Sequence, residues 1–143
     1  MILDQSYETY EKPGLVQSYK VGAVRIWKGA IVVLDKDGYA VPHRDGMSDA
    51  PFVGVAGESV DATKGNPGDK SVNVAKSGSF VFHSNVYSPT LKDLGAVAVA
   101  QGDAGCRTWH RLAHGLNIGT VVALTTTSTG KPGYRVRIDN FTV

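Results

Sequence analysis

The sequence lacks several features that define large protein classes. Its 143 residues hold one cysteine, Cys106, which cannot close an internal disulfide, so a fold held by internal disulfides is excluded. The longest uncharged apolar run, residues 30–34, is far too short for a membrane-spanning helix. The opening residues MILDQSYETYEK lack the basic start and apolar stretch of a secretory signal. These absences predict a protein of a reducing compartment that has no membrane partner.

Helical patterns are also scarce. Residues 88–95 could form a single turn and residues 107–114 a short helical piece, but neither is long enough to be a layer of the fold. The chain instead carries 17 glycines and 6 prolines among many valine, threonine and serine residues. With 42% hydrophobic and 20% charged residues, this composition predicts a globular, turn-rich, all-β protein.

Charge is unevenly distributed along the chain. Residues 1–70 hold 8 basic and 10 acidic side chains, whereas residues 71–143 hold 7 and 3, so net charge changes from −2 to +4. No cluster of basic residues is interleaved with aromatic ones, so no nucleic-acid partner is expected. The contrast instead suggests that the acidic portion of one copy could face the basic portion of another.

Short apolar or alternating runs separated by turn residues predict strands. Residues 30–34 should form a strand buried on both faces, followed by a tight turn at Asp37-Gly38 and a returning strand at 39–42. Residues 52–56 predict a further strand. Residues 71–75 and 79–83 suggest a second hairpin that turns at 76–78.

The chain also resembles itself. Residues 29–33 match 95–99 at an offset of 66, and residues 52–56 match 117–121 at an offset of 65. Pro67-Gly68 before one alternating strand matches Pro132-Gly133 before another, again at 65. We therefore expect a single all-β domain at 21–143, a sandwich or barrel of two related units at about 29–78 and 95–140.

The polar segment 1–20 has no clear period and is expected to be an extended N-terminal arm. Its aromatic residues Tyr7, Tyr10 and Tyr19 are candidate interface residues. Trp27 and Trp109 are candidates too. Trp27 falls on the outward phase of its strand, where a large ring can mark a contact surface, although a place in the packed core is the more ordinary explanation for either ring.

Evidence for chemistry is weak. Cys106, His110 and His114 share the spacing of one helix face and could form part of a zinc site, yet they provide only three ligands. A loop with a buried thiol and solvated histidines is the preferred explanation. No catalytic triad, phosphate-binding loop or calcium loop is recognisable. We therefore expect no catalytic residue, no metal and no cofactor, and a protein that acts by binding or assembly.

One family shares the order of these motifs. The series Gly29–Val33, Asp37-Gly38, Phe52–Ala56, Ser71–Ala75, Leu94–Val99, Ile118–Val122 and Tyr134–Ile138 resembles the capsid cement (head decoration) proteins of tailed bacteriophages over roughly residues 20–140. The resemblance implies a non-enzymatic homotrimer on the outer surface of the virion, assembled in the host cytoplasm. Its partner there is the major capsid protein, and it stabilises the head against internal DNA pressure.

Two alternatives remain. A monomeric β-sandwich could bind glycans or a protein ligand through Trp27, Tyr39 and Trp109, and a zinc hydrolase could use Cys106, His110 and His114. Under the cement hypothesis, the arm at 1–20 adds contact area on the shell.

Overall fold

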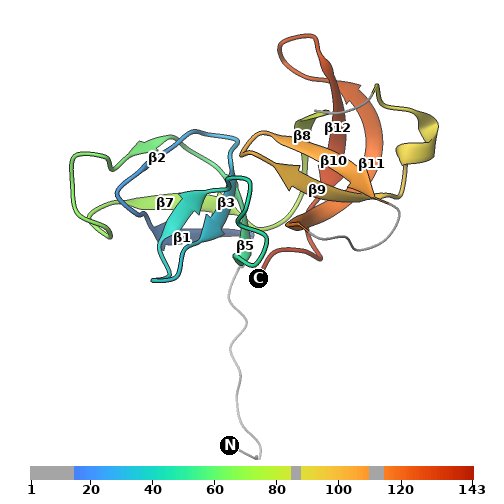
Figure 1. The fold of residues 1–143 in the computed structure, drawn as a ribbon. Coiled ribbons are helices and arrows are strands. Elements are labelled where there is room, and N and C mark those ends of the chain that lie inside the picture. The colour runs from blue at the N-terminus through green and yellow to red at the C-terminus, as the bar shows by residue number, and fades with distance from the viewer. Residues whose placement is uncertain (1–14, 85–87, 110–114) are drawn as a thin grey trace, which may run out of the picture.

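A computed structural model describes residues 15–84, 88–109 and 115–143 of the chain. The fold is all-β, as the composition predicts, with two groups of strands lying side by side (Figure 1). One short 3-10 turn, η1 (Leu91–Asp93), interrupts the strands. Among these residues, no helix has the length and apolar character needed to cross a membrane.

Unit 1 (residues 16–75) contains a curled five-stranded sheet. Its strand order is β1-β7-β5-β3-β4 with antiparallel neighbours, and a parallel bridge from Val21 to Ala40 joins the two edges. A two-stranded ribbon, β2 with β6, lies outside that sheet. The strands are β1 (Val16–Lys20), β2 (Arg25–Ile26), β3 (Ile31–Leu34), β4 (Ala40–Pro42), β5 (Phe52–Ala56), β6 (Val60–Asp61) and β7 (Ser71–Ala75).

Unit 2 (residues 79–137) is a closed barrel in the order β10-β8-β12-β11-β9. Parallel pairing of β10 with β8 closes it, through Gly105 with His83 and Cys106 with Ser84. The strands are β8 (Ser79–Ser84), β9 (Val97–Gln101), β10 (Gly105–Trp109), β11 (Asn117–Thr126) and β12 (Pro132–Arg137).

The two units have the same topology and the same register. Strands β1, β7, β5, β3 and β4 correspond to β8, β12, β11, β9 and β10, in the same order across the sheet. The parallel contact that joins the two edges is also shared. The pair Val21 and Ala40 in unit 1 corresponds to the pair Ser84 and Cys106 in unit 2. The β3–β5 partners are Ile31 with Val55, Val32 with Gly54 and Val33 with Phe52, and their β9–β11 counterparts are Val97 with Thr120, Ala98 with Gly119 and Val99 with Asn117.

Gly54 and Gly119 occupy the same place in the matching segments 52–56 and 117–121, and the structure explains why both are glycine. A Cβ at Gly54 would lie 2.1 Å from the main-chain oxygen of Ala75, and one at Gly119 would lie 2.3 Å from that of Arg137. Gly54 also has a φ of +143°, which side-chain-bearing residues rarely adopt. Each glycine sits beside a register shift in its strand pair, where the backbone of the next strand approaches too closely for any side chain.

Strand β3 is buried on both faces, as predicted. Val32 belongs to the core inside unit 1, whereas Ile31 and Val33 belong to a second buried cluster that also contains the interior of unit 2. The bulge in β5 divides that strand similarly, since Phe52 and Val55 join the second cluster. The outer face of unit 1 is therefore packed against unit 2.

The expected hairpin of residues 71–75 with 79–83 is wrong. Strand β7 pairs with β1 and β5, whereas β8 pairs with β12 and β10. Residues 76–78 instead link the units: the Lys76 N–H donates to the main-chain oxygen of Leu15, just before unit 1, and the Gly78 N–H donates to the Asp139 carboxylate just past unit 2. Each strand therefore pairs within its own unit, and residues 76–78 connect the units rather than forming a hairpin turn.

Three other expectations need correction. The arm does not extend to residue 20, because Val16–Lys20 form β1; residues 1–14 lie outside the described residues. Residues 107–109 belong to strand β10 rather than to a helical piece. Pro132-Gly133 lie inside β12, not in the turn before it, so they do not correspond to Pro67-Gly68.

Candidate interaction surface

Of the three candidate zinc ligands, the structure describes only Cys106. Cys106 lies on a strand and is fully buried in the unit 2 barrel, where burial raises the pKa of its thiol to about 12. His110 and His114 fall outside the described residues. No group of three metal-binding side chains occurs within the described ranges.

The tyrosines of the expected arm divide into two groups. Tyr7 and Tyr10 are outside the described residues, whereas Tyr19 is in β1 and packs against the core of unit 1. The Lys76 ammonium donates to the Tyr19 hydroxyl at 2.7 Å and to the main-chain oxygen of Val143. Tyr19 is half-buried and thus helps tie the linker and the last residues to unit 1.

Trp27 follows β2 and is 58% exposed, so it is not a core residue. The guanidinium of Arg25 lies 4.9 Å from the centre of its ring, within the range of a cation–π contact. This contact holds the exposed ring against the β2–β6 ribbon.

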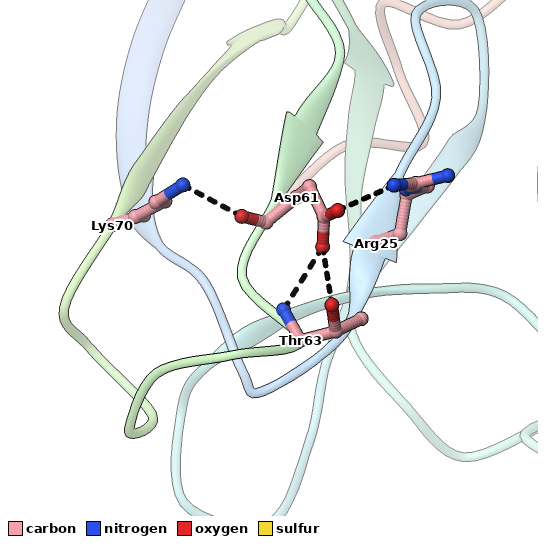
Figure 2. A network of polar contacts seen from close by, with 4 residues as sticks. All are labelled: Arg25, Asp61, Thr63 and Lys70. Carbon is pink, nitrogen blue, oxygen red and sulfur yellow. Dashed lines mark hydrogen bonds and ion pairs between the residues drawn. The ribbon is translucent and has the colours of Figure 1, made fainter.

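A network around Asp61 fixes Arg25 in that position (Figure 2). Its carboxylate pairs with Arg25 and accepts bonds from the Thr63 hydroxyl at 2.6 Å and the Thr63 N–H at 3.0 Å. These bonds, that of the Thr63 hydroxyl foremost, hold the pKa of Asp61 well below its usual range. Lys70 donates to the Asp61 main-chain oxygen at 2.7 Å. The carboxylate therefore stays ionised and keeps the guanidinium oriented.

Unit 2 repeats this arrangement on a different strand. Trp109 ends β10 and is 47% exposed, and the guanidinium of Arg107 lies 5.5 Å from its ring centre. Both tryptophans therefore follow an arginine at a spacing of two residues. Tryptophan and arginine are the residue types most enriched among those that dominate binding energy at protein interfaces.

The junction between the units is held by the turn between β9 and β10. The Ile31 N–H donates to the Asp103 main-chain oxygen at 2.7 Å, and the Gly102 N–H donates to the Asp45 carboxylate at 3.0 Å. The Nδ1 atom of buried His43 lies 2.6 Å from the Gly102 main-chain oxygen, so it is the protonated ring nitrogen there. A cavity of about 190 Å³ remains beside these contacts, lined by His43, Arg107 and Leu116 among others.

Sequence reasoning missed the arginine partners and the junction residue His43. The Arg-x-Trp spacing was a visible signal, because alternate residues of a strand point to the same side. Nothing in the pattern around His43 marked it as a contact between units. Tyr39, considered for glycan binding, instead packs close to Gly68.

Comparison with known proteins adds no relative. No family model matches the chain, and neither curated proteins nor solved structures match it.

Proposed function

We propose that this protein is a capsid cement protein that binds the outer surface of a tailed-phage head as a homotrimer. The resemblance in motif order suggests the partner, the major capsid protein, and the site on the virion, after assembly in the host cytoplasm. The observation that carries the proposal is the pair of exposed Arg–Trp contacts, one on each unit of a doubled β body.

These surfaces suit adhesion, whether the shell or a neighbouring copy of the chain covers the ring. Each stacked arginine restricts its tryptophan before binding, so less conformational entropy is lost when a partner covers the ring. Several modest contacts in each copy, multiplied by three copies, can hold an oligomer firmly to a repeating shell. No group in the mechanism needs to react, since the protein stabilises the shell by bridging its subunits.

The test is to add the purified protein to heads that lack it. DNA release on heating, followed with a DNA-binding dye, should shift to a higher temperature, and the protein should cosediment with the heads. Heads that release DNA at an unchanged temperature and sediment without the protein contradict the proposal.

A glycan-binding module is the second candidate. A hollow of about 210 Å³ beside Trp27 is lined by Arg25, Ser59, Val60 and Asp61. An exposed indole next to an ionised carboxylate can stack on a sugar ring and accept its hydroxyl hydrogen bonds. A glycan array probed with the wild type and with Trp27→Ala separates the two candidates. Only a glycan-binding module should bind glycans on the array and lose that binding in Trp27→Ala.

A further inference from the structure

The two units differ in how much of their shared outer surface is covered. In unit 1, a row of outward side chains on β3, on β5 and just after β4 is buried at the junction, whereas in unit 2 the equivalent row is half-buried or exposed. The buried row is His43, Ile31 and Val55, and the equivalent row of unit 2 is Trp109, Val97 and Thr120.

We call Val97, Arg107, Trp109 and Thr120 the outer face of unit 2. Trp109 pairs with Val97 across β10 and β9, and Val97 pairs with Thr120 across β9 and β11, so these three form one continuous row. Arg107 lies two residues before Trp109 and stacks on it. The row thus combines an aromatic, an aliphatic and a small polar side chain with an arginine at its edge, and tryptophan and arginine are residue types enriched at protein interfaces.

We propose that the outer face of unit 2 binds unit 1 of a second copy of this chain. The proposal rests on the proposed function and names the surface through which the homotrimer assembles. Unit 1 and unit 2 meet within the chain through different surfaces, so the contact is head-to-tail. A head-to-tail contact repeated between chains closes into a ring when its rotation allows, and three chains would then place six units around the axis.

The structure also indicates which part of the second copy docks on the outer face of unit 2. Within the chain, the β9–β10 turn of unit 2 docks on unit 1 through Gly102 and Asp103. The equivalent turn of unit 1 is the β3–β4 turn, in which residues 36–38 are exposed. Asp35 holds the turn, since its carboxylate accepts the N–H groups of Asp37 and Tyr39, and the exposed carboxylate of Asp37 complements the charge of Arg107.

The contact between chains must differ from the junction in one respect. In unit 1, β4 ends at Pro42, so the Ile31 N–H can donate to Asp103 of the incoming turn. In unit 2, β10 continues to Trp109, which pairs with Val97 at the equivalent position. The second copy is therefore held by side chains rather than by shared strand bonds.

The test compares two single tryptophan substitutions by light scattering over a range of concentrations. Trp109→Ala should raise the concentration at which the trimer dissociates by about 30-fold or more, because central tryptophans at interfaces contribute at least this much. Trp27→Ala is the matched control: it also removes an exposed ring that contacts an arginine, but it lies outside the outer face, so it should change dissociation less than about threefold.

A charge exchange provides a second, independent variant. Arg107→Asp and Asp37→Arg should each weaken the trimer, and the double variant should recover part of the loss. Circular dichroism checks that every variant stays folded. A trimer unaffected by Trp109→Ala and by the charge changes, or a wild-type chain that is monomeric at all concentrations, overturns the proposal.

The outcome is separable from that of the proposed function. If the outer face holds the trimer but the trimer binds no head, the interface stands and the cement function fails. If Trp109→Ala remains trimeric and still protects heads, the function stands and this interface is wrong.

Discussion

At the residue scale, Cys106 illustrates how position in the fold determines chemistry. The sequence spacing allowed a metal ligand, but the side chain points into a barrel and is fully buried. A thiol in that environment resists ionisation and is a poor nucleophile or ligand. Its contribution is to packing, together with Ile118, Tyr134 and other residues of the same cluster.

The buried thiol predicts a specific pH dependence. Its pKa rises from 9.0 in the unfolded chain to about 12 in the folded one, so its stabilisation is complete below about pH 9 and is lost as the unfolded thiol ionises above that pH. Between pH 8 and 10.5, the free energy of unfolding of the wild type should therefore fall by about 2 kcal/mol relative to that of Cys106→Ala. Urea denaturation at both pH values measures this difference, and a constant difference contradicts it.

At the element scale, the strongest signals came from local geometry. The sequence alone predicts β3, β5 and the Asp37-Gly38 turn, because burial on two faces and a positive φ each leave a clear pattern. It fails for β7 with β8, because a Lys-Ser-Gly turn fits a hairpin and a linker equally well. The β2–β6 ribbon has two residues in each strand, too few for any period to be visible.

Paired glycine substitutions test the equivalence of the two units. Gly54→Ala and Gly119→Ala should each destabilise the protein by about 3 kcal/mol or more, because the added methyl meets a main-chain oxygen that cannot move alone. Gly130→Asn is the control, since no atom lies within 4 Å of its Cβ position and asparagine tolerates the positive φ there. Thermal unfolding measures all three.

If either alanine variant is as stable as Gly130→Asn, the close approach of the strands is not required. A large loss at Gly54 without one at Gly119 means that the two units do not share the constraint.

At the scale of the whole molecule, the repeat was visible in the sequence but the arrangement of its copies was not. The outer face of unit 1 is covered by side chains from distant segments of the chain. Phe52, for example, belongs to the same buried cluster as Leu116 and Ile138. Likewise, the contacts of Arg25 with Trp27 and of Arg107 with Trp109 require knowledge of which strand face is exposed. Two units of the same topology pack asymmetrically, so the outward row that is buried in unit 1 stays half-buried or exposed in unit 2.

The most direct measurement of the central claim is a titration of undecorated heads with the protein, counting bound copies per head. If the protein binds the shell as a trimer, binding should saturate at a fixed number of copies per head. That number should correspond to three copies at each equivalent position of the lattice. Bound copies that increase without a plateau, or heads that take up none, would contradict adhesion to a repeating shell as the work of this protein.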